Sequence, residues 1–204
     1  MTLRGIHRTS AILLSAFACL HIANHLASLS SVAAHIAFMD AARSIYRHSV
    51  IEIALLLSVV IQIASGVRLV LRDWKQRRGA VPWIQAISGG YLAFFLLVHV
   101  GAVLFGRAVL KLDTNFYFAA AGFSVPPFQL FFAPYYFLGV LAVFTHLGCA
   151  AYRRLHAPSR RVRSLVVALP VLVGAVVSLL LVLVLSGTFR RVEIPAQYRA
   201  VYAR

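Results

Sequence analysis

The chain has 204 residues, of which 61% are hydrophobic and 12% are charged, and 20 Lys and Arg against 5 Asp and Glu give a net charge of +15. A soluble globular domain carries roughly 25% charged residues, so the composition excludes a soluble domain, a disordered chain and a nucleic-acid-binding domain. The basic residues lie in short clusters between long apolar segments, which is typical of membrane proteins. We therefore expect one integral membrane domain over residues 1–204, surrounded by a lipid bilayer and without a nucleic-acid partner.

Five apolar segments are long enough to cross a hydrocarbon core of about 30 Å. They cover residues 11–29, 49–71, 84–105, 130–152 and 164–189. The first four contain polar residues at membrane depth, whereas the fifth contains no ionisable residue. The sequence therefore predicts an all-α polytopic protein with five transmembrane helices, in which four form a bundle and the fifth packs at its periphery.

The distribution of Lys and Arg predicts the orientation, because cytoplasmic segments are enriched in these residues. The N-terminal segment and the second and fourth connections hold most of them: Arg4, Arg8, Arg68, Arg72, Lys75, Arg77, Arg78, Arg153, Arg154, Arg160, Arg161 and Arg163. The C-terminal tail carries four arginines that oppose this assignment, but three clusters outweigh it. We expect the N-terminus in the cytoplasm and the C-terminus outside an inner or cytoplasmic membrane.

Two long connections lie on the predicted outer side. Residues 30–48 are rich in alanine and predict a short interfacial helix, and residues 106–129 contain the helix-breaking pair Pro126-Pro127. Loops of this length are often functional. We expect both to fold over the outer end of the bundle and to meet there.

Ionisable side chains at membrane depth are costly and mark functional sites. The first span carries His21 and His25 one turn apart, and the third carries His99 at a similar depth in the outer half. His146 of the fourth span and Gln62 of the second share an inner level. Three histidines at span ends or in loops are predicted to be solvated: His7, His48 and His156.

Two histidines at one depth on different helices are the arrangement that ligates b-type haem, because the iron takes one imidazole nitrogen from each side. The alternative is that each histidine donates a hydrogen bond to a neighbouring helix, as polar residues in membrane bundles do. The residues alone leave both interpretations open.

At these residues the sequence resembles the single-chain, five-helix cytochrome b subunit that anchors succinate dehydrogenase and fumarate reductase in the membrane. The resemblance covers residues 7–155 and depends on the order and spacing of short motifs. They are His21 with Asn24-His25-Leu26, Phe38-Met39-Asp40, Ile51-Glu52-Ile53, Gly66, Ile87-Ser88-Gly89 before His99, and Phe144-Thr145-His146.

The resemblance implies one haem ligand on each of the first four helices, with helices one and three holding an outer haem and helices two and four an inner one. The outer ligands are then His99 and His21, or His25 in place of His21; His21 is preferred because the family motif places its ligand before the Asn-His pair. His146 matches the fourth helix. On the second helix Gln62 stands where the family has histidine, so we expect at most one haem b.

The function implied is that of a haem b membrane anchor, which transfers electrons between a quinone and a soluble dehydrogenase. As in the family, a flavoprotein and an iron–sulfur subunit would dock on the cytoplasmic face, near the clusters Arg72 to Arg78 and Arg153 to Arg163. Attraction of the same clusters to anionic lipid accounts for them without a protein partner. The chain would then be either a non-catalytic or a quinone-reactive subunit of an oxidoreductase complex.

Glu52 lies inside an apolar segment, where an unpaired carboxylate is driven towards its neutral form. One hypothesis is that it accepts a proton from a quinol in an outer polar pocket. The other is that it pairs with Arg47 and holds the loop in place.

Two other functional classes stay open from the sequence. One is a relative of the family without haem, acting as a transporter or a structural membrane subunit, which the Gln62 departure favours. The other is a metal-dependent membrane enzyme, in which zinc or iron is held near the outer face by His25, His35 and His48 with Asp40 or Glu52.

Overall fold

The computed structural model describes residues 2–155 and 159–202, and every regular element within these ranges is a helix. The elements are α1 (Leu3–Ala27), α2 (Val32–Tyr46), α3 (Ser49–Arg72), the short 3₁₀ helix η1 (Trp74–Gln76), α4 (Ala80–Ala108), α5 (Phe116–Ser124), α6 (Gln129–Tyr152), α7 (Arg160–Leu185) and α8 (Ala196–Arg199). Five of them, α1, α3, α4, α6 and α7, are long and apolar enough to span a membrane. The prediction of an all-α membrane protein with five spanning helices is confirmed.

Three spans, α1, α4 and α7, begin four or more residues earlier than the apolar segments indicate. The first helix starts eight residues before the predicted boundary, because the Thr2 hydroxyl accepts a hydrogen bond from a backbone N–H of the first turn and so caps the helix there. The fifth starts after Ser159, whose side chain caps it in the same way, and ends before Gly187, which has a φ of 75°. A glycine in this left-handed conformation is a common helix stop.

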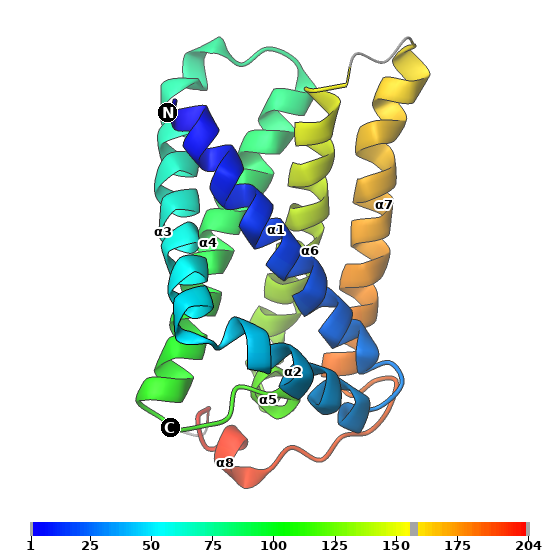
Figure 1. Cartoon of the computed structure of the whole chain (residues 1–204). Helices are drawn as coiled ribbons and strands as arrows, with labels where there is room; N and C mark the ends of the chain where they lie inside the picture. The colour runs from blue at the N-terminus through cyan, green and yellow to red at the C-terminus, as the bar shows by residue number, and fades with distance from the viewer. Residues whose placement is uncertain (1, 156–158, 203–204) are drawn as a thin grey trace.

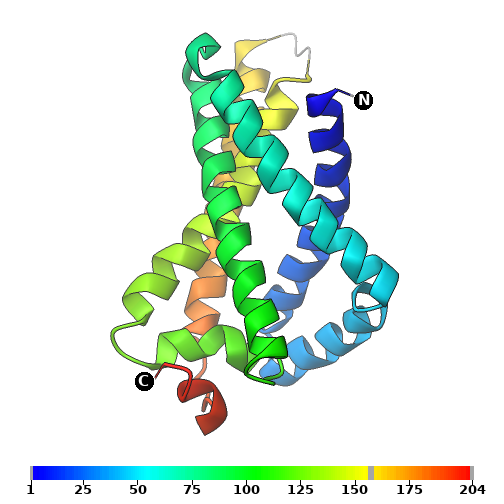
Figure 2. The ribbon, with the colours of Figure 1, turned by 90° about the vertical axis from the view of Figure 1, so that its left-hand side faces the viewer.

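The spanning helices form two groups. Figure 2 shows α1 on one side and α4, α6 and α7 on the other, with α3 running diagonally from the side of α1 to the side of α4, and Figure 1 shows α1 crossing the bundle diagonally. Neighbouring helices pack in the order α1, α3, α4, α6 and α7, and the pair α6–α7 has the most extensive contact. The two groups are joined by α3 and α4, and histidine side chains reach across between them.

The fifth span lies at the edge of the bundle against α6 (Figure 1). Glycines allow the close approach: a Cβ on Gly174 would come within 2.7 Å of the Phe144 Cβ, and a Cβ on Gly148 within 3.1 Å of the Pro170 Cβ. Small residues at such contacts are how membrane helices pack tightly without a hydrophobic driving force. This span supports the bundle from outside.

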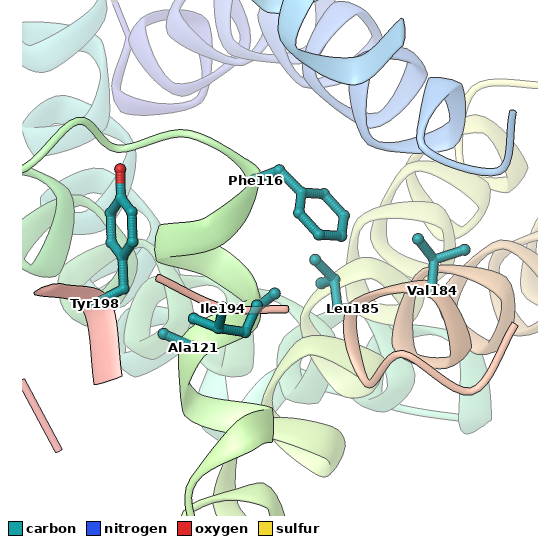
Figure 3. Packing of buried hydrophobic residues seen from close by; sticks show 7 residues of the cluster. Phe116, Ala121, Val184, Leu185, Ile194 and Tyr198 are labelled. Atoms are coloured by element: carbon teal, nitrogen blue, oxygen red, sulfur yellow. The ribbon is translucent and has the colours of Figure 1, made fainter. Parts of the chain in front are cut away.

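One end of the molecule, which we call the loop end, is covered by α2, α5 and α8 (Figures 1 and 2). The interfacial helix predicted within residues 30–48 is α2. The helices α5 and α8 pack with the end of α7 around an apolar cluster (Figure 3). The cluster consists of Phe116, Ala120, Ala121, Val184, Leu185, Ile194 and Tyr198. The loop end therefore has a small core of its own, which fixes α5 and α8 on the end of α7.

Two arginines, Arg43 near the end of α2 and Arg47 directly after it, bind the second long connection. Arg43 forms an ion pair with Asp113 at 2.8 Å and donates to the Thr114 carbonyl at 3.1 Å, and Arg47 donates to the Thr114 hydroxyl at 3.1 Å. The prediction that the loops meet over the bundle is confirmed.

At the opposite end, which we call the basic end, lie the start of α1, η1 and the end of α6. Asp73 accepts hydrogen bonds from Arg72 and Arg4, each at 2.8 Å. These hydrogen bonds lower the pKa of Asp73 to about 2. The Arg77 guanidinium lies 5.5 Å from the ring centres of both Trp74 and Trp83. Tryptophan and arginine in this position are typical of a membrane–water interface.

Candidate functional site

Four imidazole rings from three helices form a continuous row in the loop-end half, which we call the histidine row. It begins at His99 on α4, passes through His21 and His25 on α1 and ends at His35 on α2. The successive ring centres are 5.9, 4.7 and 5.1 Å apart. The row thus leads from the interior of the bundle to the helix that covers the loop end.

Aromatic side chains form the walls of the row. Phe17 stacks on His21 at 5.5 Å, Phe95 stacks on His99 at 5.1 Å, and Phe116 meets His35 edge-on at 5.5 Å. Phe95 also stacks on Tyr135. These rings surround the imidazoles with apolar surface, which excludes water and favours their neutral form.

Several polar atoms in the row have no protein partner. The only side-chain hydrogen bond at its outer end joins the Asn24 amide nitrogen to His35 Nε2 at 3.3 Å, whereas Asn24 Oδ1, His25 Nδ1 and His35 Nδ1 are buried without a partner among the described residues. Buried polar atoms in native proteins are nearly always hydrogen-bonded. These three atoms are therefore available to form hydrogen bonds with water or a ligand.

His35 is 1% exposed although it belongs to a connecting helix. Burial, with smaller contributions from His21 and Arg43, lowers the pKa of His35 to about 4. The ring is therefore neutral at pH 7, and a neutral imidazole keeps one nitrogen lone pair available as an acceptor or a metal ligand.

The innermost pair, His21 and His99, fits the donor set of a bis-imidazole site. Imidazole nitrogen binds a transition metal at about 2 Å, so two rings on opposite sides of one ion have centres roughly 6 Å apart. The observed separation is 5.9 Å. Neither ring has a hydrogen-bond partner in residues 2–155 or 159–202, so the lone pairs are not committed elsewhere. The α1 ring that meets His99 is His21, while His25 lies between His21 and His35.

His146 and Gln62, which share the inner level in the sequence analysis, bind different helices. His146 Nδ1 lies 3.1 Å from the Gln85 carbonyl oxygen and 3.4 Å from Ser88 Oγ, both on α4. The Gln62 side chain accepts a hydrogen bond from Ser10 on α1 at 2.7 Å. The two side chains therefore do not pair with each other.

The prediction that His7 is solvated is wrong. The ring is half-buried, with Nδ1 2.8 Å from Ser65 Oγ and Nε2 3.2 Å from the Gln62 amide nitrogen. The early start of α1 places this position within the spanning helix. The signal was present in the sequence, because His7 precedes His21 by 14 residues, which is about four helical turns and puts both on one face. His48 is exposed, as predicted, and His156 lies outside the described residues.

Glu52 is in the first turn of α3 and binds Arg107 of α4, not Arg47 as the sequence suggested. The sequence favoured Arg47 because it is closer in the chain. In the folded protein the end of α4 lies beside the start of α3, and Arg47 turns to Thr114 instead. Among the residues that the structure describes, no group of three or more His, Cys, Asp or Glu side chains is arranged to hold a metal ion.

Comparison with protein-family models, with curated proteins and with solved structures found no match. The functional assignment therefore depends on the geometry of the histidines and on the motifs in the sequence.

Proposed function

We propose that the chain is a haem b-binding membrane anchor, which carries electrons between a membrane quinone and a soluble dehydrogenase of the succinate dehydrogenase or fumarate reductase type. The observation that carries this proposal is the His21–His99 pair, one ring from each helix group, with centres 5.9 Å apart and no competing hydrogen bond among the described residues. It is supported by the order of the family motifs and by the five spanning helices.

The roles of the residues follow from their chemistry. His21 and His99 present imidazoles from α1 and α4, and the unprotonated ring nitrogen of each would hold the haem iron. Phe17 and Phe95 stack on these two rings, fix their planes and exclude water. When bound, haem b supplies a one-electron redox couple.

The two ends of the molecule have different roles in this proposal. The basic end would face the cytoplasm and receive the iron–sulfur and flavoprotein subunits, because the arginines around η1 and the end of α6 offer a positive surface to acidic partners. The loop end would face outside. There Glu52, beside Arg107, would accept a proton released when a quinol is oxidised, and would pass it to the solvent.

An absorption spectrum tests the proposal directly. The full chain, purified in detergent, oxidised and then reduced with dithionite, should show the bands of a b-type cytochrome. His99→Ala and His21→Ala should lose these bands, whereas His48→Ala, which removes an exposed histidine of the same chain, should keep them. A preparation without haem bands would overturn the proposal, and so would an unchanged spectrum in His99→Ala.

A further inference from the structure

The two imidazoles of the proposed haem site have the same neighbour in the chain. Phe17 precedes His21 by four residues on α1, and Phe95 precedes His99 by four residues on α4. Side chains four residues apart lie on one face of a helix. In both pairs the rings are stacked, with interplanar angles of 14° and 11°. Each phenylalanine therefore restricts the rotation of the imidazole that follows it.

A tyrosine from a neighbouring helix contacts each of these phenylalanines. Tyr46 at the end of α2 meets Phe17 edge-on at 5.4 Å, whereas Tyr135 of α6 stacks on Phe95 at 4.8 Å. Tyr46 is half-buried, and Tyr135 is 4% exposed. On the α4 side the stack thus extends over three rings from two helices, from His99 to Tyr135.

The Tyr135 hydroxyl also binds the backbone of the turn that carries His99. It donates to the Phe95 carbonyl oxygen at 3.2 Å. Within α4 this oxygen is the acceptor for the His99 N–H, because an α-helix bonds each N–H to the carbonyl four residues earlier. A carbonyl oxygen has two lone pairs and can accept both hydrogen bonds. Tyr135 therefore holds the ring that stacks on His99 and also the backbone group to which His99 is bonded.

Gly139 of α6, one turn after Tyr135, leaves the space that the Phe95 ring occupies. A Cβ on Gly139 would lie 2.4 Å from Phe95 Cε2 and 2.5 Å from Phe95 Cδ2, so a side chain there would have to displace the ring. Gly101 of α4, two residues after His99, has nothing within 4 Å of its Cβ position. The absence of a side chain therefore matters to Phe95 at Gly139 and not at Gly101.

A second tyrosine forms the reciprocal hydrogen bond between the same two helices. Tyr91 of α4 donates its hydroxyl to the Tyr135 carbonyl oxygen at 3.1 Å. Its ring meets Phe94, which is 47% exposed, edge-on at 5.8 Å. The two hydroxyls thus join α4 to α6 in the same way, but the one on Tyr135 binds the turn that carries His99.

We propose that Tyr135 is a positioning residue for the haem ligand His99, acting through the ring and the carbonyl of Phe95. This inference rests on the proposed function. Residues that support a metal ligand fix its orientation, and their loss typically weakens metal binding by roughly 10- to 100-fold. Gly139 contributes the space in which Phe95 lies. The Tyr135 hydroxyl is committed to the Phe95 carbonyl, so Tyr135 acts on the orientation of His99 and not as a ligand.

The experiment compares Tyr135→Phe with Tyr91→Phe in the full chain, purified in detergent. Each variant keeps its ring and loses one hydroxyl and one hydrogen bond between α4 and α6. Titration of the apoprotein with haemin should show about 10-fold weaker binding in Tyr135→Phe and binding close to wild type in Tyr91→Phe. The electron paramagnetic resonance spectrum of the ferric haem, which depends on the angle between the two imidazole planes, should change in Tyr135→Phe alone.

Two glycine variants test the same inference from the α6 backbone. Gly139→Ala and Gly101→Ala each add one methyl group to a spanning helix. Gly139→Ala should weaken haemin binding and change the resonance spectrum, whereas Gly101→Ala should do neither. Circular dichroism of the apoproteins shows whether each variant folds, and if Gly139→Ala does not fold, the tyrosine pair decides the question.

The outcomes separate this inference from the proposed function. Wild-type haemin affinity and resonance spectrum in Tyr135→Phe would overturn the inference and leave the proposed function intact. Equal changes in Tyr135→Phe and Tyr91→Phe would also overturn it, because loss of any hydrogen bond between α4 and α6 would then be sufficient. A wild-type chain that binds no haem would overturn the proposed function and this inference with it.

Discussion

The histidine rings in the two halves of the bundle are held by different kinds of contact. In the basic-end half each imidazole Nδ1 has a hydrogen-bond partner on the neighbouring helix. In the loop-end half the rings stack on aromatic side chains and on one another, while His25 Nδ1 and His35 Nδ1 have no partner in the described residues. The first arrangement holds the rings by hydrogen bonds between helices, and the second holds them by stacking against aromatic side chains.

The difference follows from what surrounds each ring. Serines stand opposite the basic-end histidines, and a serine oxygen can accept and donate at once. Phenylalanines stand opposite the loop-end histidines, and Asn24 is the one amide close to them. An aromatic wall holds a ring plane without consuming its nitrogens, so these nitrogens stay available for a ligand or ordered water.

The largest effect is expected when the aromatic wall of the histidine row is removed. Phe95→Ala leaves a cavity next to His99 and Tyr135, and truncating a packed phenylalanine costs about 3 kcal/mol or more. The free energy of unfolding in detergent should fall by this amount, and the absorption bands of the haem held by His21 and His99 should be lost. Phe94→Ala removes the neighbouring ring, which is 47% exposed. It should change the free energy of unfolding and the haem spectrum only slightly. Equal effects of the two variants would show that Phe95 is not part of the site.

The second prediction concerns acid and applies to the loop-end half. Because the pKa of His35 is lowered to about 4 in the folded chain, the unfolded chain binds its proton first as the pH falls. Stability should therefore be lost between pH 6.5 and pH 4, by at most about 3 kcal/mol at 1.36 kcal/mol per pKa unit. His35→Gln should flatten the curve of unfolding temperature against pH in this interval, whereas His48→Gln should not. A wild-type curve that is flat over the interval would contradict the burial of a neutral His35.

The third prediction tests the hydrogen bond between His7 and Ser65 in the basic-end half. Ser65→Ala removes the hydroxyl that lies 2.8 Å from the Nδ1 atom of the half-buried His7, and loss of a typical hydrogen bond costs about 1 kcal/mol. The unfolding midpoint should fall accordingly. Ser58→Ala changes another buried serine of the same helix, one that forms no hydrogen bond to a histidine among the described residues, and should be close to neutral. If both variants behave alike, the Ser65 hydrogen bond does not distinguish the two halves.

The smallest effect is expected at the membrane surface of the basic end. Asp73→Asn removes the acceptor of Arg4 and Arg72, and exposed ion pairs contribute about 1 kcal/mol or less. Since the pKa of Asp73 is lowered to about 2, this contribution is present above the unfolded value near 4 and is lost as the pH falls towards 2. The difference between Asp73→Asn and wild type should shrink in high salt. A difference that is independent of salt would mean that Asp73 acts through packing.

Much of the fold follows from the sequence alone, because the length and composition of each segment determine whether it forms a helix and whether that helix can span a bilayer. Hydrophobic segments of the right length make five spanning helices, and the alanine-rich connection makes α2. The same is true of part of the site. His21 and His99 were expected at one depth, and the helix rise along two spans that run in the same direction is sufficient to match them. These features need only the period of the helix and the thickness of the bilayer.

The partners of the polar residues were decided by the tertiary structure. The diagonal course of α1 brings His7 beside α3, and the end of α4 brings Arg107 to Glu52, although a nearer arginine was available in the chain. The burial of His35 likewise depends on how α2 folds back over α1 and α5, which no local pattern encodes. Helix order, tilt and rotation are set by packing between distant segments. The sequence by itself therefore determined that there are five spanning helices and that His21 and His99 lie at a similar level along them, and the packing of the helices decided which polar side chains meet.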